Sequence, residues 1–389
     1  MIDALLLIVL APLIVATGVF AIETGLGVRP RRRAEVASPY DPARVVVLVP
    51  AHDEAGGIHA ALMQQRATMP AEMRILVVAD NCTDDTAECA RAAGAEVVER
   101  NDLTRRGKGY ALDHGRAQLL ADPPVCVIVV DADTIAVGDA LDRLAARAIA
   151  TERPVQGAYY LSVGASDGPI ARFSAAAFFV KNVVRELGKA RLGAPAVLTG
   201  SGMAFPWPIF ATLPLATGHI AEDLMLGVQA SLAGSPPSFD AGAAIVGTGS
   251  SDKGTAVQRR RWESGFVQVA QDSALPLLAR AVRHRQWRLG WLGLHLLTPP
   301  LMLLLAADAV AVAIGAGLLL AGIASWPFWT MLALTSLAVL LVVAGLVAHG
   351  QGALLRDWAA IPGYILWKLR LSITALFRRE TRWIRTDRD

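Results

Sequence analysis

Charge and cysteine are both scarce in this sequence. Acidic and basic residues together make up 18% of the 389 residues, whereas hydrophobic residues make up 54%. A chain this apolar is not an ordinary soluble enzyme, because a soluble protein carries more charge than this on its surface. The three cysteines, Cys82, Cys89 and Cys126, form no CxxC pair. That pattern fits a reducing compartment.

Two common nucleotide-binding fingerprints are also missing. The sequence contains neither GxGxxG nor GxxxxGK[ST], so it predicts neither a dinucleotide-binding turn nor a P-loop. The net charge of +3 is small and lies mostly beside the apolar ends of the chain. This placement favours anionic lipid headgroups as partners and predicts no nucleic-acid partner.

The N-terminal end is apolar enough to cross a membrane. Residues 5–22 contain no charge, and this length is about that needed to cross a bilayer core of roughly 30 Å. A signal peptide is the alternative, but the start Met1-Ile2-Asp3 lacks the basic region that begins one. Four arginines follow: Arg29, Arg31, Arg32 and Arg33. The positive-inside rule therefore predicts that the next domain is cytoplasmic.

The C-terminal third is also apolar. Residues 291–323 are interrupted by Asp308 and by Pro299-Pro300, and a straight helix of that length would span roughly 50 Å, so we expect a break or a strong tilt. Residues 326–347 form a cleaner second span. Residues 356–388 mix basic and aromatic side chains, which predicts an interfacial helix and a cytoplasmic tail. We therefore divide the chain into a transmembrane helix with a basic linker (1–40), a catalytic domain (41–270) and C-terminal membrane helices (271–389).

The middle of the chain predicts an α/β domain. Four β-branched runs predict strands, and stretches of helical character lie between them. The predicted strands are residues 45–49, 75–78, 96–99 and 125–130, and the predicted helices are residues 57–69, 86–93 and 109–120. Near-continuous hydrophobic strands that alternate with helices indicate a mostly parallel sheet with helices on both faces.

Polar signatures follow several of the predicted strands. His52-Asp53-Glu54, Asp80-Asn81 and Asp131-Ala132-Asp133 all fall just beyond a strand. In open α/β sheets, ligands bind beyond the carboxyl ends of the strands. The convergence of three polar signatures at such positions predicts a binding site.

Asp131 and Asp133 can both face one cation, because they are two residues apart beyond a buried strand. A hard ion with oxygen ligands would be Mg²⁺ or Mn²⁺, and it would neutralise charge on a leaving diphosphate. A solvated loop or a helix cap is the alternative for an isolated pair of this kind. The strongly apolar strand that precedes the pair favours the metal site.

Two further signatures could hold a nucleotide. Asp80 and Glu54 could read a uracil edge, although an Asx-turn that opens the next helix would also explain the residues after Asp80. Lys108 lies in the segment Arg105-Arg106-Gly107-Lys108-Gly109, whose cations and glycines suit a pyrophosphate. Most such clusters are solvated surface.

Glu222-Asp223 precedes a predicted helix over residues 224–232. An acidic first turn that complements the helix dipole is the simple explanation. However, Gly200-Ser201-Gly202 lies upstream and a basic segment lies downstream, so the acids could lie between two walls of an acceptor cleft. We expect Gly202 and Glu222 to contact the acceptor and Asp223 to take a proton from its hydroxyl group.

The basic segment is Gln258-Arg259-Arg260-Arg261-Trp262. It could be an interfacial helix anchored by Trp262. It could instead pair an arginine with a diphosphate and stack Trp262 on a sugar ring. The residues before it, 247–254, have the composition of a gating loop, which favours the second interpretation.

Taken in order, these signatures resemble those of membrane-bound family 2 glycosyltransferases, the group that contains cellulose, chitin and hyaluronan synthases. The resemblance covers residues 45–262 and extends loosely to the membrane helices. It implies a GT-A nucleotide-sugar-binding domain and inversion at the anomeric carbon. In the donor site it implies that Glu54 and Asp80 bind uridine and that Asp131 and Asp133 form the DxD motif, with Asp133 as the usual metal ligand.

The resemblance also implies roles for later residues. Asp223 matches the acid that closes the TED motif of the family, which is the general base. Gln258, Arg261 and Trp262 match its QxxRW motif, which braces the diphosphate and the acceptor sugar. The sequence departs from the family pattern at three positions, none of which removes a required carboxylate. These are Ala221 in place of the Thr of TED, Ala79 in place of a second Asp, and His52 in place of Asn.

The sequence therefore predicts an integral membrane enzyme of a bacterial-type inner or plasma membrane. It would transfer sugar from a nucleotide-sugar donor, UDP-linked, to a growing polysaccharide, with Mg²⁺ or Mn²⁺ as cofactor. A lipid transferase that adds a single sugar is the alternative. Membrane lipids would be partners, and a homo-oligomer or an export partner could complete a polymer channel that about three spans do not form alone.

Two further alternatives carry less support. A membrane scaffold or transport subunit with a decayed site is disfavoured, because all the expected carboxylates are present. A nucleotidyltransferase would leave residues 258–262 unexplained.

Overall fold

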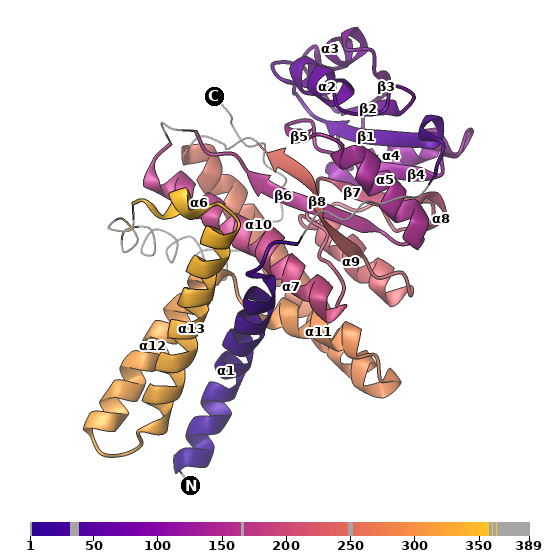
Figure 1. The fold of residues 1–389 in the computed structure, drawn as a ribbon. Helices are drawn as coiled ribbons and strands as arrows, with labels where there is room; N and C mark the ends of the chain where they lie inside the picture. Colours follow the sequence, from indigo (N-terminus) through magenta and orange to yellow (C-terminus); the bar gives the residue numbers. More distant parts are fainter. Residues whose placement is uncertain are drawn as a thin grey trace.

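The computed structural model describes residues 2–31, 39–164, 167–247, 252–357, 360 and 363, with side chains left out at 252–261. An α/β sheet domain lies at one end of the molecule, and long apolar helices extend away from it (Figure 1). The N-terminus lies at the far end of the first of these helices.

The α/β domain contains one eight-stranded sheet, with the strand order β3-β2-β1-β4-β7-β6-β8-β5. The strands are β1 (Val45–Ala51), β2 (Arg74–Asp80), β3 (Glu96–Arg100), β4 (Cys126–Val129), β5 (Thr134–Ala136), β6 (Val155–Leu161), β7 (Met203–Pro206) and β8 (Ser238–Gly247). β1 pairs in parallel with β2 and β4, and β2 pairs in parallel with β3. β7 is antiparallel to both of its neighbours, β4 and β6. The sheet is therefore mixed but mostly parallel, as the sequence predicts.

Helices cover both faces of the sheet because side chains alternate along each strand. On β1, Val45, Val47 and Val49 pack into one core cluster, whereas Val46 and Leu48 pack into another. The helices of this domain are α2 (Ile58–Arg66), α3 (Thr86–Ala92), α4 (Lys108–Leu119), α5 (Ala140–Thr151), α8 (Trp207–Phe210) and α9 (Glu222–Leu232). α2, α3 and α5 contribute to the first cluster, and α4, α8 and α9 contribute to the second. All the strands and helices predicted for this domain are present, with ends shifted by a few residues at most.

Three helices of the described chain are long and apolar enough to cross a membrane: α1 (Ile2–Gly27), α12 (Leu301–Leu320) and α13 (Trp326–Ala348). They lie side by side (Figure 1). The break expected in residues 291–323 is confirmed, because α11 (Trp287–Leu297) ends just before Pro299-Pro300 and α12 begins just after. A proline ring cannot continue the backbone hydrogen bonding of a helix.

The single charge of α12 is turned into the helix bundle. Asp308 is fully buried, and Thr17 of α1 donates a hydrogen bond of 2.8 Å to its Oδ1 atom. Ionisable groups within membrane helices almost always face the bundle interior in this way.

A continuous helical stretch connects the apolar helices to the sheet domain. It runs through α6 (Pro169–Phe179), the π-helical turn η2 (Val180–Val184) and α7 (Arg185–Leu192). Glu23 of α1 is fully buried and forms an ion pair with Arg185 at 2.6 Å. Glu23 also accepts a hydrogen bond of 2.9 Å from the indole N–H of Trp291. These contacts fix α1 and α11 against the stretch that leads into the sheet domain.

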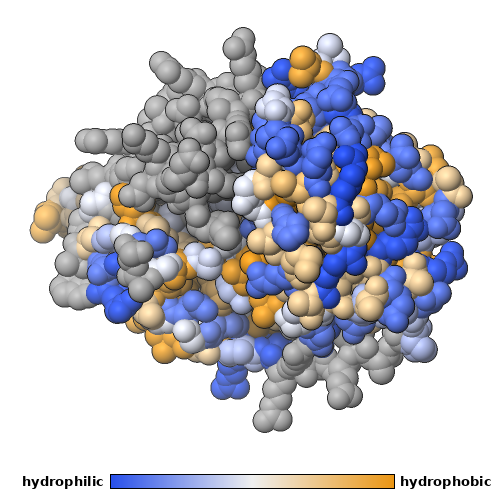
Figure 2. Space-filling view, turned by 90° about the horizontal axis from the view of Figure 1, so that it is seen from above, coloured by the Kyte–Doolittle hydropathy of each residue, from blue (hydrophilic) through white to orange (hydrophobic). Residues whose placement is uncertain are grey.

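The surface seen from the end opposite the apolar helices is largely hydrophilic wherever it is coloured, with smaller apolar patches among the charged residues (Figure 2). This distribution is typical of a domain that faces water. The division of the chain at residues 40 and 270 stays a prediction, and α10 (Asp252–His284) runs through residue 270.

Two predicted segments fall largely outside the described residues. The interfacial helix expected within residues 356–388 is one. The predicted gating loop at 247–254 is the other, although its last three residues, 252–254, already belong to α10.

Candidate active site

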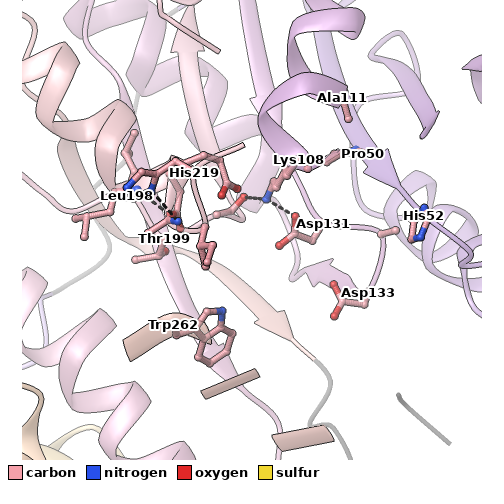
Figure 3. Close-up of a pocket in the computed structure, with 18 of the residues that line it drawn as sticks. Pro50, His52, Lys108, Ala111, Asp131, Asp133, Leu198, Thr199, His219 and Trp262 are labelled. Atoms are coloured by element: carbon pink, nitrogen blue, oxygen red, sulfur yellow. Dashed lines mark hydrogen bonds and ion pairs between the residues drawn. The ribbon is translucent and has the colours of Figure 1, made fainter. Parts of the chain in front are cut away.

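A cavity of about 270 Å³ lies beyond the carboxyl ends of β1, β2 and β4. Its walls bring together residues from six of the signatures read from the sequence. They include Glu54, Asp80, Asn81, Lys108, Asp131, Asp133, Glu222, Asp223 and Trp262. Figure 3 shows Lys108 facing Asp131, with His219 on one side and Asp133 on the other. The convergence expected from the parallel sheet is therefore present.

Lys108 connects two parts of the cavity wall. It begins α4, and its Nζ atom forms an ion pair with Asp131 and donates a hydrogen bond of 2.6 Å to the carbonyl oxygen of Gly200. The backbone N–H of Asp131 donates to Ser201 Oγ at 3.1 Å. Lys108 thus ties the end of β4 to the loop that precedes β7.

Gly200 occupies the point where three charged side chains meet. Its φ of +91° lies in the left-handed region, which favours glycine. A Cβ atom at this position would lie 3.2 Å from Asp223 Oδ2, 3.5 Å from Lys108 Nζ and 3.8 Å from Asp131 Oδ2. The DxD acid, the lysine and the proposed base therefore lie around one small space.

Burial shifts the pKa values of the two acids at the start of α9. Removal from water raises the pKa of Glu222 to about 8, and the neighbouring Asp223 carboxylate adds to the increase. Burial also raises the pKa of Asp223, although the charges of Lys108 and Lys181 oppose that increase. Perturbed carboxyl groups of this kind, in a cleft beside a cation, are typical of catalytic sites.

The two lysines respond differently to burial. Burial alone would lower the pKa of Lys108, but the carboxylates of Asp131 and Glu222 outweigh it and the net pKa is raised. For Lys181, burial dominates and lowers the pKa, with partial compensation from Asp223. Lys108 therefore has strong carboxylate partners, whereas Lys181 does not.

Asp80 is held rigidly at the other end of the cavity. Arg100 donates to its Oδ1 atom at 2.6 Å, and Asn81 Nδ2 donates to the same atom at 3.0 Å. His52 Nδ1 lies 2.7 Å from the backbone oxygen of Asp80. Glu54 lines the same part of the cavity. Arg100 belongs to the edge strand β3, and nothing in the sequence pattern marks it as a partner of Asp80.

Trp262 is the described member of the basic segment of α10. Its ring lies 5.4 Å from that of Phe178, centroid to centroid, and it lines the cavity. The side chains of Gln258 and Arg261 lie outside the described part of the chain, so their predicted roles stay predictions.

Gly202 does not line the cavity, contrary to what its predicted contact with the acceptor requires. It is buried with a φ of +67°, and a Cβ atom there would overlap Ile245 Cγ1 of β8. A glycine is therefore needed at position 202 so that the backbone can pack closely against Ile245. Gly200 is the glycine of this loop that faces the cavity.

Several polar groups in the walls have no hydrogen-bond partner among the described residues. These are both side-chain atoms of Asn182, the hydroxyl of Thr199 and Nε2 of His219. His219 Nδ1 accepts a hydrogen bond of 3.1 Å from the backbone N–H of Ala221, so a neutral ring carries its proton on Nε2. The sequence offered no signal for these residues, because neither burial nor loss of a partner is visible in a local pattern.

The acidic residues of the cavity suit a hard divalent cation. Asp131 and Asp133 both line it, and both are only partly buried. Carboxylate oxygens are the ligands that Mg²⁺ and Mn²⁺ prefer. A second group of possible ligands, Asp53, Cys82 and Asp84, lies outside the cavity. Its carboxylates already accept backbone hydrogen bonds, such as that from Thr83 N to Asp53 at 2.6 Å, so it organises a loop.

The sheet, which is of GT-A type, and the acidic cavity at its carboxyl edge define a sugar-transferring enzyme. Residues 42–265 match the family described as "Glycosyltransferase like family 2". Because this match covers more than half of the 389 residues, the chain belongs to that family and is a glycosyltransferase.

One comparison with a solved structure supports this fold. The chain is similar to the mannosyltransferase PcManGT from Pyrobaculum calidifontis in complex with GDP-Man and Mn²⁺. The two are 20% identical, the match covers 86% of this chain and 99% of that chain, and the TM-score is 0.50. A second similar structure is glucosyl-3-phosphoglycerate synthase from Mycobacterium tuberculosis in complex with Mn²⁺, UDP and glucosyl-3-phosphoglycerate, with 20% identity, 61% and 87% coverage and a TM-score of 0.42. A comparison with curated protein sequences found no match.

Proposed function

We propose that this protein transfers a sugar, with inversion, from a nucleotide-sugar donor to a hydroxyl group at the membrane surface. The observation that carries the proposal is the meeting of Asp223, Lys108 and Asp131 around Gly200. A base, a cation and a DxD acid within one small space are the groups that such a transfer requires. The UDP-linked donor expected from the sequence is part of the proposal.

Asp223 is the proposed general base. Its carboxylate takes the proton from the acceptor hydroxyl as the oxygen attacks the anomeric carbon, on the face opposite the departing diphosphate. Burial raises the pKa of Asp223, which makes its carboxylate a stronger proton acceptor than an exposed aspartate. Glu222, the neighbouring acid, contacts the acceptor in this proposal.

Lys108 is the proposed cation for the diphosphate. Its Nζ atom is already placed between Asp131 and Gly200. A lysine ammonium beside the leaving group stabilises the negative charge that develops there. Gln258, Arg261 and Trp262 would brace the donor from α10, with Trp262 also contacting the acceptor.

Asp80 and Glu54 would bind the nucleoside. Arg100 and Asn81 both donate hydrogen bonds to Oδ1 of Asp80. The Oδ2 atom would therefore accept a hydrogen bond from the nucleobase of the donor. The rigid anchoring of Asp80 favours this role, because an acceptor that is already oriented loses little freedom on binding.

Mg²⁺ or Mn²⁺ is the proposed cofactor, held by Asp133 and Asp131. When bound, such an ion neutralises charge on a diphosphate. The fold shared with PcManGT, whose structure contains Mn²⁺, supports this assignment. Removal of divalent cations with a chelator is expected to abolish transfer. Asp133→Asn should weaken nucleoside-diphosphate binding in the presence of Mn²⁺ but leave it unchanged in the chelator.

For the acceptor, we propose a growing polysaccharide, on the basis of the resemblance of residues 258–262 to the motif of the polysaccharide synthases. The second candidate is a lipid that receives one sugar. A second cavity between the catalytic cavity and the apolar helices favours a lipid-borne acceptor. We place the catalytic domain on the cytoplasmic side of the membrane, where nucleotide sugars are made.

The test is release of nucleoside diphosphate by the full-length protein in lipid. A panel of UDP- and GDP-sugars would be supplied with membrane lipids and short oligosaccharides, with and without Mn²⁺ or Mg²⁺. We expect one donor to respond and Asp223→Asn to reduce the rate about 10²- to 10⁴-fold. Asp272→Asn, an exposed acid on α10, is the matched control and should retain full activity. If no donor responds and none binds, the proposed function is wrong.

The products separate the two acceptors. A polysaccharide synthase gives a ladder of lengths, whereas a single-addition enzyme gives one extractable glycolipid.

A further inference from the structure

A second cavity of about 100 Å³ adjoins the catalytic cavity on the side of the apolar helices. Phe20 of α1 and Leu301 and Met302 of α12 form part of its wall, next to Pro299 and Pro300. Leu301 is the first residue of α12, and Phe20 lies in the half of α1 nearer to the sheet domain. The cavity therefore lies where two candidate membrane spans meet the catalytic domain.

The two cavities share a wall of four residues, Phe178, Lys181, Trp262 and Phe266. Three of them are aromatic, and the Nζ atom of Lys181 lies 5.8 Å from the centroid of the Phe266 ring. A molecule that reached from the second cavity into the first would pass these rings and this ammonium group.

Lys181 makes no ion pair with any described residue. The other cation of the second cavity, Arg185, is already paired with Glu23 at 2.6 Å. Glu263 also lines the second cavity but has a partner of its own. Lys181 is only partly buried, but an ammonium group that lines two cavities without an anionic partner favours an anion that arrives with a ligand.

Asn182 follows Lys181 on the same π-helical turn. Such turns are rare in proteins, but many of those that occur lie at functional sites. Its side chain is 2% exposed, it lines the catalytic cavity, and neither its amide nitrogen nor its oxygen has a partner among the described residues. An unsatisfied buried amide destabilises the protein unless a ligand completes its hydrogen bonds. This observation indicates a polar, hydroxyl-bearing group beside the anion.

We propose that the acceptor is a lipid-linked saccharide with an anionic phosphate linkage. Its apolar chain occupies the second cavity, its phosphate pairs with Lys181, and its sugar hydrogen-bonds with Asn182 in front of Asp223. This inference rests on the proposed function and, of its two candidate acceptors, selects the lipid-borne one in place of the growing polysaccharide.

The chemistry is consistent with a hydroxyl nucleophile on that sugar. The hydroxyl oxygen forms a new bond to the anomeric carbon, the bond from that carbon to the diphosphate oxygen breaks, and the proton passes to the Asp223 carboxylate. A phosphate oxygen as nucleophile would need no base, so the phosphate is assigned to binding and the sugar hydroxyl to attack.

The test uses full-length protein in nanodiscs and the nucleotide sugar that supports transfer. Three acceptors with the same sugar are compared: one linked to a lipid through phosphate, one linked to a neutral lipid, and one that is water-soluble. We expect the lowest KM for the first acceptor. Lys181→Met should raise that KM about ten- to hundredfold. Lys181→Arg keeps the positive charge and should have a KM close to that of the wild type. Equal KM values for the three acceptors would overturn the proposal.

A second pair of variants tests the cavity itself. Leu301→Trp fills it and should raise the KM for both lipid-linked acceptors, whereas Leu320→Trp, at a position of α12 that is 88% exposed, should have no effect. Equal effects of the two variants would contradict the assignment.

Asn182→Leu separates ligand binding from structure. A residue that merely supports the fold would lower Tm when replaced, whereas Asn182→Leu should leave Tm unchanged or raise it and still raise the KM for the acceptor. A lower Tm with an unchanged KM would overturn the role of Asn182.

If no nucleoside diphosphate binds to the wild-type protein, the proposed function has failed, and that result is distinguishable from failure of the acceptor assignment.

Discussion

At the scale of single residues, the active site depends on charges that burial places in unusual states. Glu222 and Asp223 are adjacent acids with raised pKa values, and Lys108 is stabilised as a cation between them and Asp131. Two neighbouring carboxyl groups in a low-dielectric site do not both ionise easily. The protonation of Glu222 and Asp223 therefore depends on pH and on what occupies the cavity.

Glu222 should make stability fall with increasing pH. Its pKa is about 8 in the folded protein against an ordinary value of 4.5. Below about pH 4.5 the group is protonated in both states. Between 4.5 and 8 the folded chain retains a proton that the unfolded chain has released, so the stabilisation is lost as pH rises through this range. Glu222→Gln lacks this loss, and its Tm relative to the wild type should increase from pH 5 to pH 8.5. Parallel Tm curves would show that Glu222 is not shifted.

Gly200→Ala tests the meeting point of the charged groups. The added methyl would lie 3.2 Å from Asp223 Oδ2 on a backbone with a φ of +91°. We expect kcat to fall about 10²-fold, because small displacements of catalytic groups cost that much. Gly234→Ala is the matched control, since its φ is +93° but nothing lies within 4 Å of the added Cβ. If both variants lose activity equally, backbone strain is the cause and crowding at the site is not.

At the scale of elements, the attachment of α1 to the turn η2 links a candidate membrane span to the cavity. Gly27 of α1 lies directly against the backbone of Val184, the last residue of η2. The same turn carries Lys181 and Asn182 into the catalytic cavity. A change in how α1 packs should therefore be felt at the active site.

Gly27→Ala should separate these two elements. A Cβ atom at Gly27 would overlap the carbonyl oxygen of Val184, whereas one at Gly18, in the same helix, would meet nothing within 4 Å. We expect Gly27→Ala to lower both Tm and the transfer rate in nanodiscs, and Gly18→Ala to change neither. Wild-type behaviour of Gly27→Ala would show that α1 can shift without cost.

At the scale of the whole molecule, three candidate spans give the chain an orientation. The sheet domain lies at one end of these helices, and the N-terminus lies at the other (Figure 1). The turn between α12 and α13 contains the exposed residue Ser325. The basic residues that follow α1 predict that the sheet domain is cytoplasmic.

Cysteine labelling tests this orientation. In a background without the three native cysteines, Ser325→Cys should react with a membrane-impermeant thiol reagent added to intact cells. Thr104→Cys, in an exposed loop of the sheet domain, should react only after the cells are opened. The reverse pattern would place the catalytic domain outside.

The sequence alone determined the order of the elements and the edge of the sheet at which the site lies. Apolar runs identified the strands β1 to β4 because burial on both faces leaves a local signature, and the polar residues after them had to meet at the carboxyl edge. Asp131 and Asp133 were therefore placed at this edge without coordinates, whereas Asp223, at the start of α9, was placed beside them from its position between two other signatures and from the family resemblance. The break at Pro299-Pro300 was also predicted, because proline acts on its own backbone.

Only the tertiary structure decided which side chains touch. Lys108 and Gly200 are 92 residues apart, and no local pattern brings them together. Asn182 could not be recognised, because its burial and its unsatisfied amide result from packing of the whole chain. Gly202 was assigned to the acceptor from its neighbours in sequence, whereas packing against Ile245 turns it away and leaves Gly200 at the site. Local patterns record the burial of whole elements, but a contact between distant residues is set by how those elements pack.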